Sequence, residues 1–407
     1  MLRFRQFLNE GGAFGHLSNV FDINFTFGEM KNIIDASLKG ELENVRLKTD
    51  GQNLMFSYID GEIRMARNAG HIKNFGAASL TADGMATKFA ARGGLEVAYN
   101  NAIIDLRAAI SNLSDKQIQK IFKNGKKFMS IEVMHVDSPN VVLYGSNQLR
   151  FHGTREYDKD GNVVGDFKKD GDILAGMIKQ RGAQQQKTFV IKPLELVKLP
   201  EEPNFDKQKS IFIKMLNKII KPFRLGDSDK FDEYKKRYWM RLLKAHGINN
   251  EQLLKRWAFF DKTYSIANIK KDNYSESQLK WILDFDKTKH QDEAKEMMLP
   301  FEFLFLRLGA TVLKNIQQFM VANPDKSVKR MNKQIDKVLK LAKGSGDPKV
   351  LKKVNLELRR IENAGGMKMI SPEEGITFMY KGEFLKFTGL FAPINQLIGL
   401  LYQLEPK

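Results

Sequence analysis

The feature that most constrains the fold is a change of residue pattern that occurs twice along the chain. Alternating apolar and polar residues, typical of strands, occur in residues 11–199 and return in residues 366–407. Between them, residues 200–365 carry apolar side chains at helical spacing in almost every segment. The pattern predicts an α+β fold whose antiparallel-sheet domain is interrupted by a large all-helical insertion. An insertion of this length is usually a second domain.

Asp-Gly pairs divide the strand-like residues near the N-terminus. Asp50-Gly51 and Asp60-Gly61 separate three alternating runs, at Val45–Thr49, Asn53–Ile59 and Glu62–Arg67. An Asp-Gly pair between alternating runs is a strong signal for a tight hairpin, so we expect both pairs to be hairpin turns. Beyond the insertion, Gly375–Tyr380 and Glu383–Phe387 predict another hairpin.

Composition narrows the classes of function. The 407 residues include 66 Lys and Arg against 48 Asp and Glu, a net charge of +18, and no cysteine. The absence of cysteine excludes disulfides, cysteine-ligated metals and thiol catalysis. No stretch approaches the roughly 18 consecutive apolar residues of a membrane span, so no membrane partner is expected. The positive charge favours a polyanionic partner, with nucleic acid the first candidate.

The helical insertion carries most of this charge. Residues 201–365 hold 35 Lys and Arg against 22 Asp and Glu. We expect basic residues on two of its helices to bind a phosphate backbone: Lys236, Arg237, Arg241, Lys329, Arg330 and Lys333. The alternative is that these are ordinary solvated helix faces. Its aromatic residues, such as Trp257, Trp281 and Tyr264, would stack bases or form a core, and the usual burial of large aromatics favours the core.

Two residues point to chemistry. Lys48, in Lys48-Thr49-Asp50-Gly51, ends a strand beside a turn, where partial desolvation would lower its pKa and make its amine a nucleophile. The alternative is a solvated lysine before a turn. Glu132 places one carboxylate inside the apolar run Phe128–Val133, where a charge needs a partner, a metal or a ligand.

The order of these motifs resembles the covalent nucleotidyltransferase superfamily, which includes ATP-dependent DNA ligases, RNA ligases and mRNA-capping enzymes. Lys48-Thr49-Asp50-Gly51 resembles its K-x-D-G motif, and Glu374-Gly375-Ile376-Thr377 resembles its E-G-I-V motif. The resemblance implies that Lys48 takes the nucleotide and that Glu374 and Glu132 serve the metal. It further implies that Phe151 stacks on the base and that Lys386 contacts the phosphates. The other implied nucleotide-binding residues are Asp50, Gly51, Arg67 and Glu132.

The resemblance implies an ATP- and Mg²⁺-dependent polynucleotide ligase or related nucleotidyltransferase. Such an enzyme forms a lysyl-AMP intermediate and joins the 5′-phosphate end of RNA or DNA to a 3′-hydroxyl. Thr388 stands where the family has the second Lys of its K-x-K motif, and Arg46 where many DNA ligases have Glu. The alternative is a non-catalytic, packaged phage protein that binds nucleic acid through a degenerate nucleotidyltransferase fold.

The N-terminus carries a further pattern. Phe7-Leu8-Asn9-Glu10 precedes Gly11 and resembles the leaders of internal head proteins of large tailed phages, which a prohead protease clips after Glu. Residues 1–10 would then be a cleaved leader. The protein would reside in the virion of a bacteriophage and then in the host cytoplasm. Without this cleavage, host cytoplasm is the expected location.

Overall fold

The computed structural model describes residues 17–139, 141–142, 144–316 and 324–404 and has an α+β fold with antiparallel sheets. Its strands are β1 (Glu43–Lys48), β2 (Gln52–Ile59), β3 (Glu62–Ala66), β4 (Lys127–Met134), β5 (Gln148–Tyr157), β6 (Val163–Phe167), β7 (Val190–Pro193), β8 (Gly375–Tyr380) and β9 (Glu383–Phe387). The main helices before the insertion are α1 (Phe27–Lys39), α3 (Ala82–Phe89), α4 (Gly94–Ile110), α5 (Asp115–Phe122) and α6 (Asp170–Gln180), with a short turn α2 (Lys73–Gly76).

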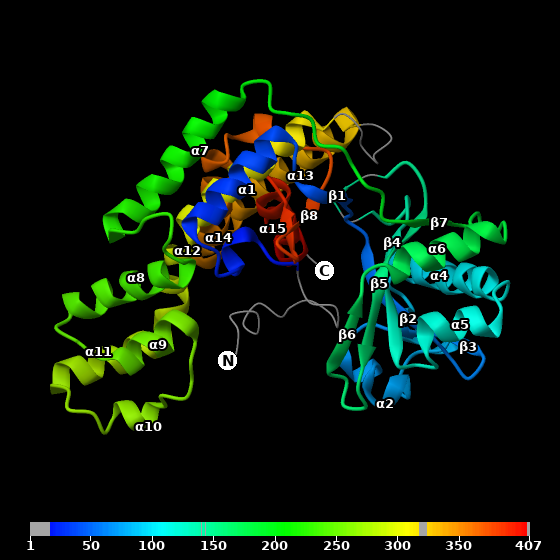
Figure 1. The fold of residues 1–407 in the computed structure, drawn as a ribbon, viewed down its shortest axis with the longest axis horizontal. Coiled ribbons are helices and arrows are strands. Elements are labelled where there is room, and N and C mark those ends of the chain that lie inside the picture. Colours follow the sequence, from blue (N-terminus) through cyan, green and yellow to red (C-terminus); the bar gives the residue numbers. More distant parts are fainter. Residues whose placement is uncertain (1–16, 140, 143, 317–323, 405–407) are drawn as a thin grey trace.

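The strands form two sheets. The larger, six-stranded sheet has the order β3-β2-β4-β5-β6, with β7 parallel to β5. Helices α4, α5 and α6 cover one face of it (Figure 1). The smaller sheet has the order β1-β8-β9, so the C-terminal hairpin pairs with β1, the first strand of the described residues. This pairing brings Lys48 opposite Gly375.

The predicted hairpin at Asp50-Gly51 is wrong, whereas the one at Asp60-Gly61 is confirmed. Strands β2 and β3 are joined directly, with Ile59 opposite Glu62. Strand β1 does not pair with β2, because the Asp50-Gly51 turn carries the chain from the small sheet to the large one. Gly51 fits because the turn lies against β4, where an added Cβ would approach the Cβ of Glu132 at 3.0 Å.

Helices fill the insertion as the apolar spacing predicts. They are α7 (Phe205–Ile220), α8 (Phe231–Ala245), α9 (Glu251–Phe259), α10 (Ile266–Ile269), α11 (Glu276–Thr288), α12 (His290–Asn315), α13 (Pro324–Ser345) and α14 (Pro348–Asn363). Local signals set several ends: Asn250 and Ser275 cap α9 and α11, and Pro348 opens α14. Helices α15 (Phe391–Gly399) and α16 (Leu401–Leu404) end the described chain. No helix of the described residues is long and apolar enough to cross a membrane.

The helical segment packs directly on the small sheet. One apolar core contains Leu47 of β1, Phe378 of β8 and Phe387 of β9 together with Phe301 and Leu308 of α12. Helices α8–α11 extend from this core, away from the large sheet (Figure 1). A second core joins α13, α14 and α15 to the loop residues Val141 and Val142. The small sheet therefore shares its core with the insertion.

Candidate functional site

Lys48 and Glu374 form an ion pair at the end of the small sheet. The Nζ of Lys48 contacts the Oε1 of Glu374, and their side chains are 21% and 11% exposed. Lys48 is the last residue of β1, and Glu374 directly precedes β8, so the pairing of these strands places the two side chains together. Residues more than 300 positions apart in the sequence are thus in contact.

Glu132 of the large sheet adds a second carboxylate. Its neighbours Ile131 and Val133 face the apolar core, so strand alternation places Glu132 on the opposite, polar face. The Oε2 of Glu132 is buried and has no hydrogen-bond partner among the described residues. Its charge acts on both Lys48 and Glu374, so the polar faces of the two sheets meet at this cluster.

Burial and the nearby carboxyl groups determine the pKa values of Lys48 and Glu374. Burial would lower the pKa of Lys48, but the carboxylates of Glu374, Glu132 and Asp50 outweigh burial, so its pKa is raised. The lowered pKa expected from the strand-end position is therefore wrong. Burial raises the pKa of Glu374 to about 7, with further contributions from Asp50 and Glu132 against the opposing effect of Lys48. Glu374 thus titrates near neutral pH.

Asp50 braces the turn that carries Lys48. Its Oδ2 accepts hydrogen bonds from the backbone N–H groups of Val141 at 2.6 Å and Val142 at 2.8 Å. Its own backbone N–H donates to the hydroxyl of Tyr144 at 2.5 Å. These bonds tie the Asp50-Gly51 turn to the loop after β4. Sequence reasoning missed Tyr144, because nothing local in a loop marks it as a partner of a turn more than ninety residues earlier.

Gly375 and Lys386 complete the small-sheet side of the cluster. An added Cβ at Gly375 would lie 2.2 Å from the carbonyl oxygen of Phe387, so close strand packing requires glycine there. Lys386 lies opposite Thr377 on β9. Burial lowers the pKa of Lys386, and the nearby charge of Lys48 lowers it further. Both lysines therefore belong to one polar group of residues.

Arg67 lies on the large sheet just beyond β3. Its Nη1 donates to the carbonyl oxygen of Asn53 and to the hydroxyl of Tyr99, the latter at 2.6 Å. Asn53 is opposite Glu132 in the strand register. Arg67 is therefore held near the end of β2 that follows the Lys48 turn.

The structure does not bring Phe151 to the cluster. Its ring is fully buried in the core of the large sheet and packs 5.9 Å from the ring of Phe56, so it has no free face for a base. The next residue, His152, lies on the polar face, where its Nε2 is 3.8 Å from the Oε2 of Glu132. Strand alternation was the signal that would have favoured His152 over Phe151.

The carboxylates fit the chemistry of a magnesium site in part. Glu132 and Glu374 offer the hard oxygen ligands that Mg²⁺ prefers, and the buried Oε2 of Glu132 lacks a protein partner in the described chain. No cluster of three or more acidic or histidine side chains among the described residues is arranged to hold a metal ion. Two carboxylates, completed by water and substrate phosphate, are a usual arrangement for Mg²⁺.

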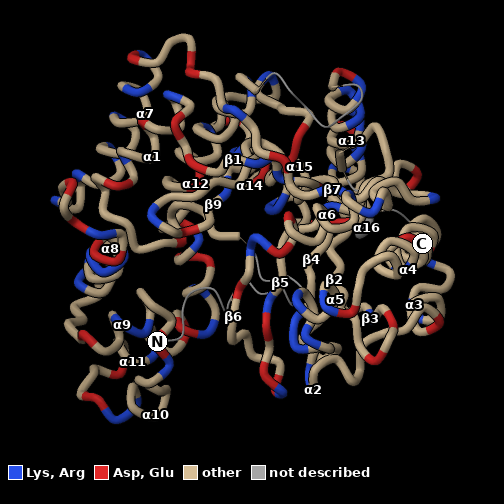
Figure 2. The backbone as a smooth tube through the Cα atoms, turned by 45° about the vertical axis from the view of Figure 1, so that its right-hand side comes forward, with Lys and Arg blue, Asp and Glu red and all other residues tan. Residues whose placement is uncertain are grey.

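The expected nucleic-acid-binding residues lie on two separate helices (Figures 1 and 2). On α8, Arg237 is committed to protein contacts: it pairs with Glu233 at 3.0 Å and donates to the carbonyl oxygens of Phe223 and Arg224. Lys236 lies 3.9 Å from Glu233, and Arg241 is exposed.

On α13, Lys329 and Lys333 are exposed and Arg330 is half-buried. Helices α8 and α13 pack in different cores. The structure therefore does not gather the six residues into one patch. Among the aromatic residues of the insertion, Trp257 and Tyr264 are buried, as expected for core residues, and Trp281 is half-buried.

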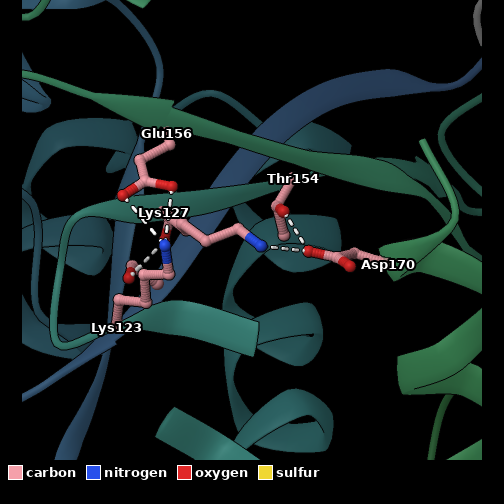
Figure 3. A network of polar contacts seen from close by, with 6 residues as sticks. Lys123, Lys127, Thr154, Glu156 and Asp170 are labelled. Atoms are coloured by element: carbon pink, nitrogen blue, oxygen red, sulfur yellow. Dashed lines mark hydrogen bonds and ion pairs between the residues drawn. The ribbon is translucent and has the colours of Figure 1, made fainter. Parts of the chain in front are cut away.

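A buried lysine, Lys127, lies on the covered side of the large sheet (Figure 3). Lys127 pairs with Asp170 at the start of α6, and the hydroxyl of Thr154 donates to the same carboxylate. The Lys127 ammonium also lies 3.7 Å from the centre of the Phe167 ring. Nearby, Lys123 pairs with Glu156 at 2.8 Å at the surface. These contacts tie α6 to β4 and β5.

Comparisons of the chain with protein-family models, with curated proteins and with solved structures find no match.

The expected cleavage after Glu10 lies outside the described residues.

Proposed function

We propose that the protein is an ATP- and Mg²⁺-dependent nucleotidyltransferase of the polynucleotide-ligase type, with a nucleotidyltransferase-like arrangement of its two sheets. One observation carries the proposal. Lys48, Glu374 and Glu132 come from three distant parts of the chain and meet at the junction of two polar sheet faces. A purely structural ion pair needs one acid, whereas this lysine has several.

The proposed first step uses the Lys48 amine as the nucleophile. Glu374, whose pKa is about 7, accepts a proton from the Nζ of Lys48. The nitrogen lone pair attacks the α-phosphorus of ATP, a P–N bond forms, and the P–O bond to the departing pyrophosphate breaks. Lys386 would contact phosphate oxygens, and Arg67 the sugar side of the nucleotide.

Mg²⁺ would be held by Glu132, and by Glu374 while its carboxyl is ionised, and would supply charge neutralisation at the phosphates. Asp50 and Gly51 keep the turn against β4, which holds Lys48 in place. The AMP would then pass to a 5′-phosphate end, and a 3′-hydroxyl would displace it. The positive charge of the insertion supports a nucleic-acid partner, either RNA or DNA.

The test is incubation with α-labelled ATP, GTP or NAD⁺ in the presence of Mg²⁺. We expect a covalent label with ATP that is absent in Lys48→Ala. A label with GTP alone would indicate capping-type chemistry. No label with any of the three would reject the enzyme.

The raised pKa of Lys48 favours the second candidate, a packaged phage protein without catalysis, because a protonated amine paired with acids is a stable structural arrangement. This candidate predicts salt-sensitive nucleic-acid binding that Lys48→Ala leaves unchanged. Loss of an end-joining activity in Lys48→Ala would exclude it.

A further inference from the structure

Three basic groups converge beyond the end of β3: Arg67, His71 and Lys88 on the last turn of α3. The backbone N–H of Arg67 lies 3.2 Å from the Nδ1 of His71. The Nζ of Lys88 lies 3.0 Å from the Nε2 of the same ring. The imidazole of His71 is therefore in contact with a hydrogen-bond donor at each of its two nitrogens.

A neutral imidazole accepts at one nitrogen and donates at the other. If Nδ1 accepts from Arg67, Nε2 carries a proton and faces the ammonium of Lys88. If Nε2 accepts from Lys88, Nδ1 carries a proton and faces the N–H of Arg67. In either neutral tautomer, one ring N–H therefore faces another hydrogen-bond donor. In a protonated ring, both ring N–H groups face a donor. An acceptor placed between the imidazole and Lys88 removes the conflict.

The charges around this ring favour an anion as that acceptor. Burial lowers the pKa of His71 and the charge of Lys88 lowers it further, so the ring is neutral beside a cation. Arg67 uses Nη1 for its contacts with Asn53 and Tyr99, so its remaining guanidinium donors have no partner among the described residues. Lys88 is exposed and has no acidic partner in the described chain.

The position of these groups links them to the candidate site. Arg67 is bonded to Asn53, which lies two residues after Gly51 and opposite Glu132 in the strand register. An anion held here would therefore adjoin the Lys48 cluster on the large-sheet side. None of the basic residues expected from the sequence to grip nucleic acid lies on this part of the fold.

We propose that Arg67, His71 and Lys88 form a phosphate-binding site that takes a phosphate group of a nucleic-acid strand. The proposal deepens the ligase function and rests on it for the identity of the strand. The phosphate itself is recognised by two to three donors and positive charge, which fits its several acceptor oxygens. The site would place the strand beside β3 and α3, next to the nucleotide.

The first experiment measures binding of matched single-stranded oligonucleotides with a 5′-phosphate or a 5′-hydroxyl as salt is varied. We expect Lys88→Ala to bind several-fold more weakly and to reduce the slope of log K against log salt by about 0.7. Lys88→Arg should restore the slope. Lys116→Ala removes an exposed lysine of α5 and should match the wild type. Thermal melting of each variant checks that the fold is kept.

The two strands distinguish the bound group. A loss confined to the 5′-phosphorylated strand assigns the site to the terminal phosphate, and an equal loss with both strands assigns it to a backbone phosphate. The second experiment titrates inorganic phosphate while the imidazole nitrogen resonances of His71 are followed by NMR, with His71→Gln used for assignment. We expect these resonances to shift in the wild type and to shift less in Lys88→Ala.

The outcomes separate this proposal from the proposed function. If phosphate shifts His71 but neither strand depends on Lys88, the anion site stands and its occupant is free phosphate or a nucleotide. If Lys48 takes no label but strand binding depends on Lys88, the ligase is rejected and the phosphate site stands. Unmoved His71 resonances together with unchanged strand binding in Lys88→Ala would overturn the site.

Discussion

Two lysines, one half-buried and one buried, are each paired with an acid and differ in what surrounds the pair. Lys127, with its side chain 4% exposed, shares Asp170 with the hydroxyl of Thr154 and lies against the Phe167 ring. Lys48 pairs with Glu374 while Glu132 and Asp50 add further negative charge. The first pair is balanced and joins a helix to a sheet. The second has an excess of acid at the junction of two polar faces, which is the arrangement expected of a site that receives a ligand.

The largest expected effect is on covalent labelling. Lys48→Ala should abolish labelling by α-labelled ATP because it removes the attacking nitrogen, whereas Lys127→Ala should retain labelling in the fraction that remains folded. The measurement is label per folded protein, with folding checked by circular dichroism. Equal labelling of wild type and Lys48→Ala would reverse the roles given to the two lysines.

The stability effects should run the other way. Lys127→Ala should lower the free energy of unfolding by about 3 kcal/mol, because it leaves the buried Asp170 without its cation. Lys48→Ala should cost less, because Glu374, with its pKa of about 7, can be neutralised by a proton. Chemical denaturation measures both. A larger cost for Lys48→Ala than for Lys127→Ala would contradict the comparison.

The glycine beside Glu374 offers a test of the strand geometry behind the pair. Gly375→Ala should destabilise the protein by about 1–3 kcal/mol, because its Cβ would meet the backbone of Phe387. Gly176→Ala, inside α6, is the control: its Cβ meets nothing within 4 Å, and alanine favours a helix. The melting temperatures of the two variants should therefore shift in opposite directions. Equal shifts would contradict the strand register at Lys48.

Much of the fold follows from local pattern. Helical spacing predicts most of the insertion helices, because their apolar residues recur at helical spacing, and α9, α10, α11 and α14 also begin at a side-chain cap. The final hairpin, β8 and β9, has the predicted bounds because alternating residues and the Lys381-Gly382 turn are also local signals. The sequence predicts that this hairpin belongs to the sheet domain, but it does not predict that the hairpin pairs with β1. Strand order depends on contacts between residues far apart in the chain, and local patterns do not determine those contacts.

The errors at the site have physical causes. Asp50-Gly51 has the residues of a hairpin turn, but the carboxylate of Asp50 bonds to a distant loop and the chain changes sheets. The family resemblance puts a base-stacking ring at Phe151, although strand alternation buries that position in the core. The raised pKa of Lys48 depends on three acids brought together by folding, and only two of them are far from it in sequence.

The smallest stability effect expected concerns the surface pair beside Lys127. Lys123→Ala should change the free energy of unfolding by less than about 1 kcal/mol, because its side chain is 46% exposed and water screens its pairing with Glu156. Denaturation curves of this variant beside Lys127→Ala measure the effect of burial on neighbouring ion pairs (Figure 3). Similar losses in both variants would mean that burial is not what separates them.

The pH dependence gives a finer test of the Lys48 pair. The carboxyl of Glu374 has its pKa raised from 4.5 to about 7, so the folded chain keeps a proton that the unfolded chain releases. The contribution of this group to stability is present below about pH 4.5 and is lost as pH rises toward 7. The ionised fraction of Glu374, which is needed to take the Lys48 proton, increases over the same pH range. The labelling rate should therefore increase through about pH 7.

Glu374→Gln should remove that inflection and slow labelling strongly, while Lys127→Ala should keep it. Single-turnover labelling across pH gives both profiles. An unchanged inflection in Glu374→Gln would assign the titrating group to another residue.

The most direct test of the central claim is to locate the nucleotide on the chain. Wild-type protein is incubated with ATP and Mg²⁺, digested under non-acidic conditions and analysed by mass spectrometry, with Lys48→Ala and Lys123→Ala treated in parallel. The account predicts AMP on the peptide that contains Lys48 in the wild type and in Lys123→Ala, and on no peptide of Lys48→Ala. AMP on another lysine, or on none, would contradict it.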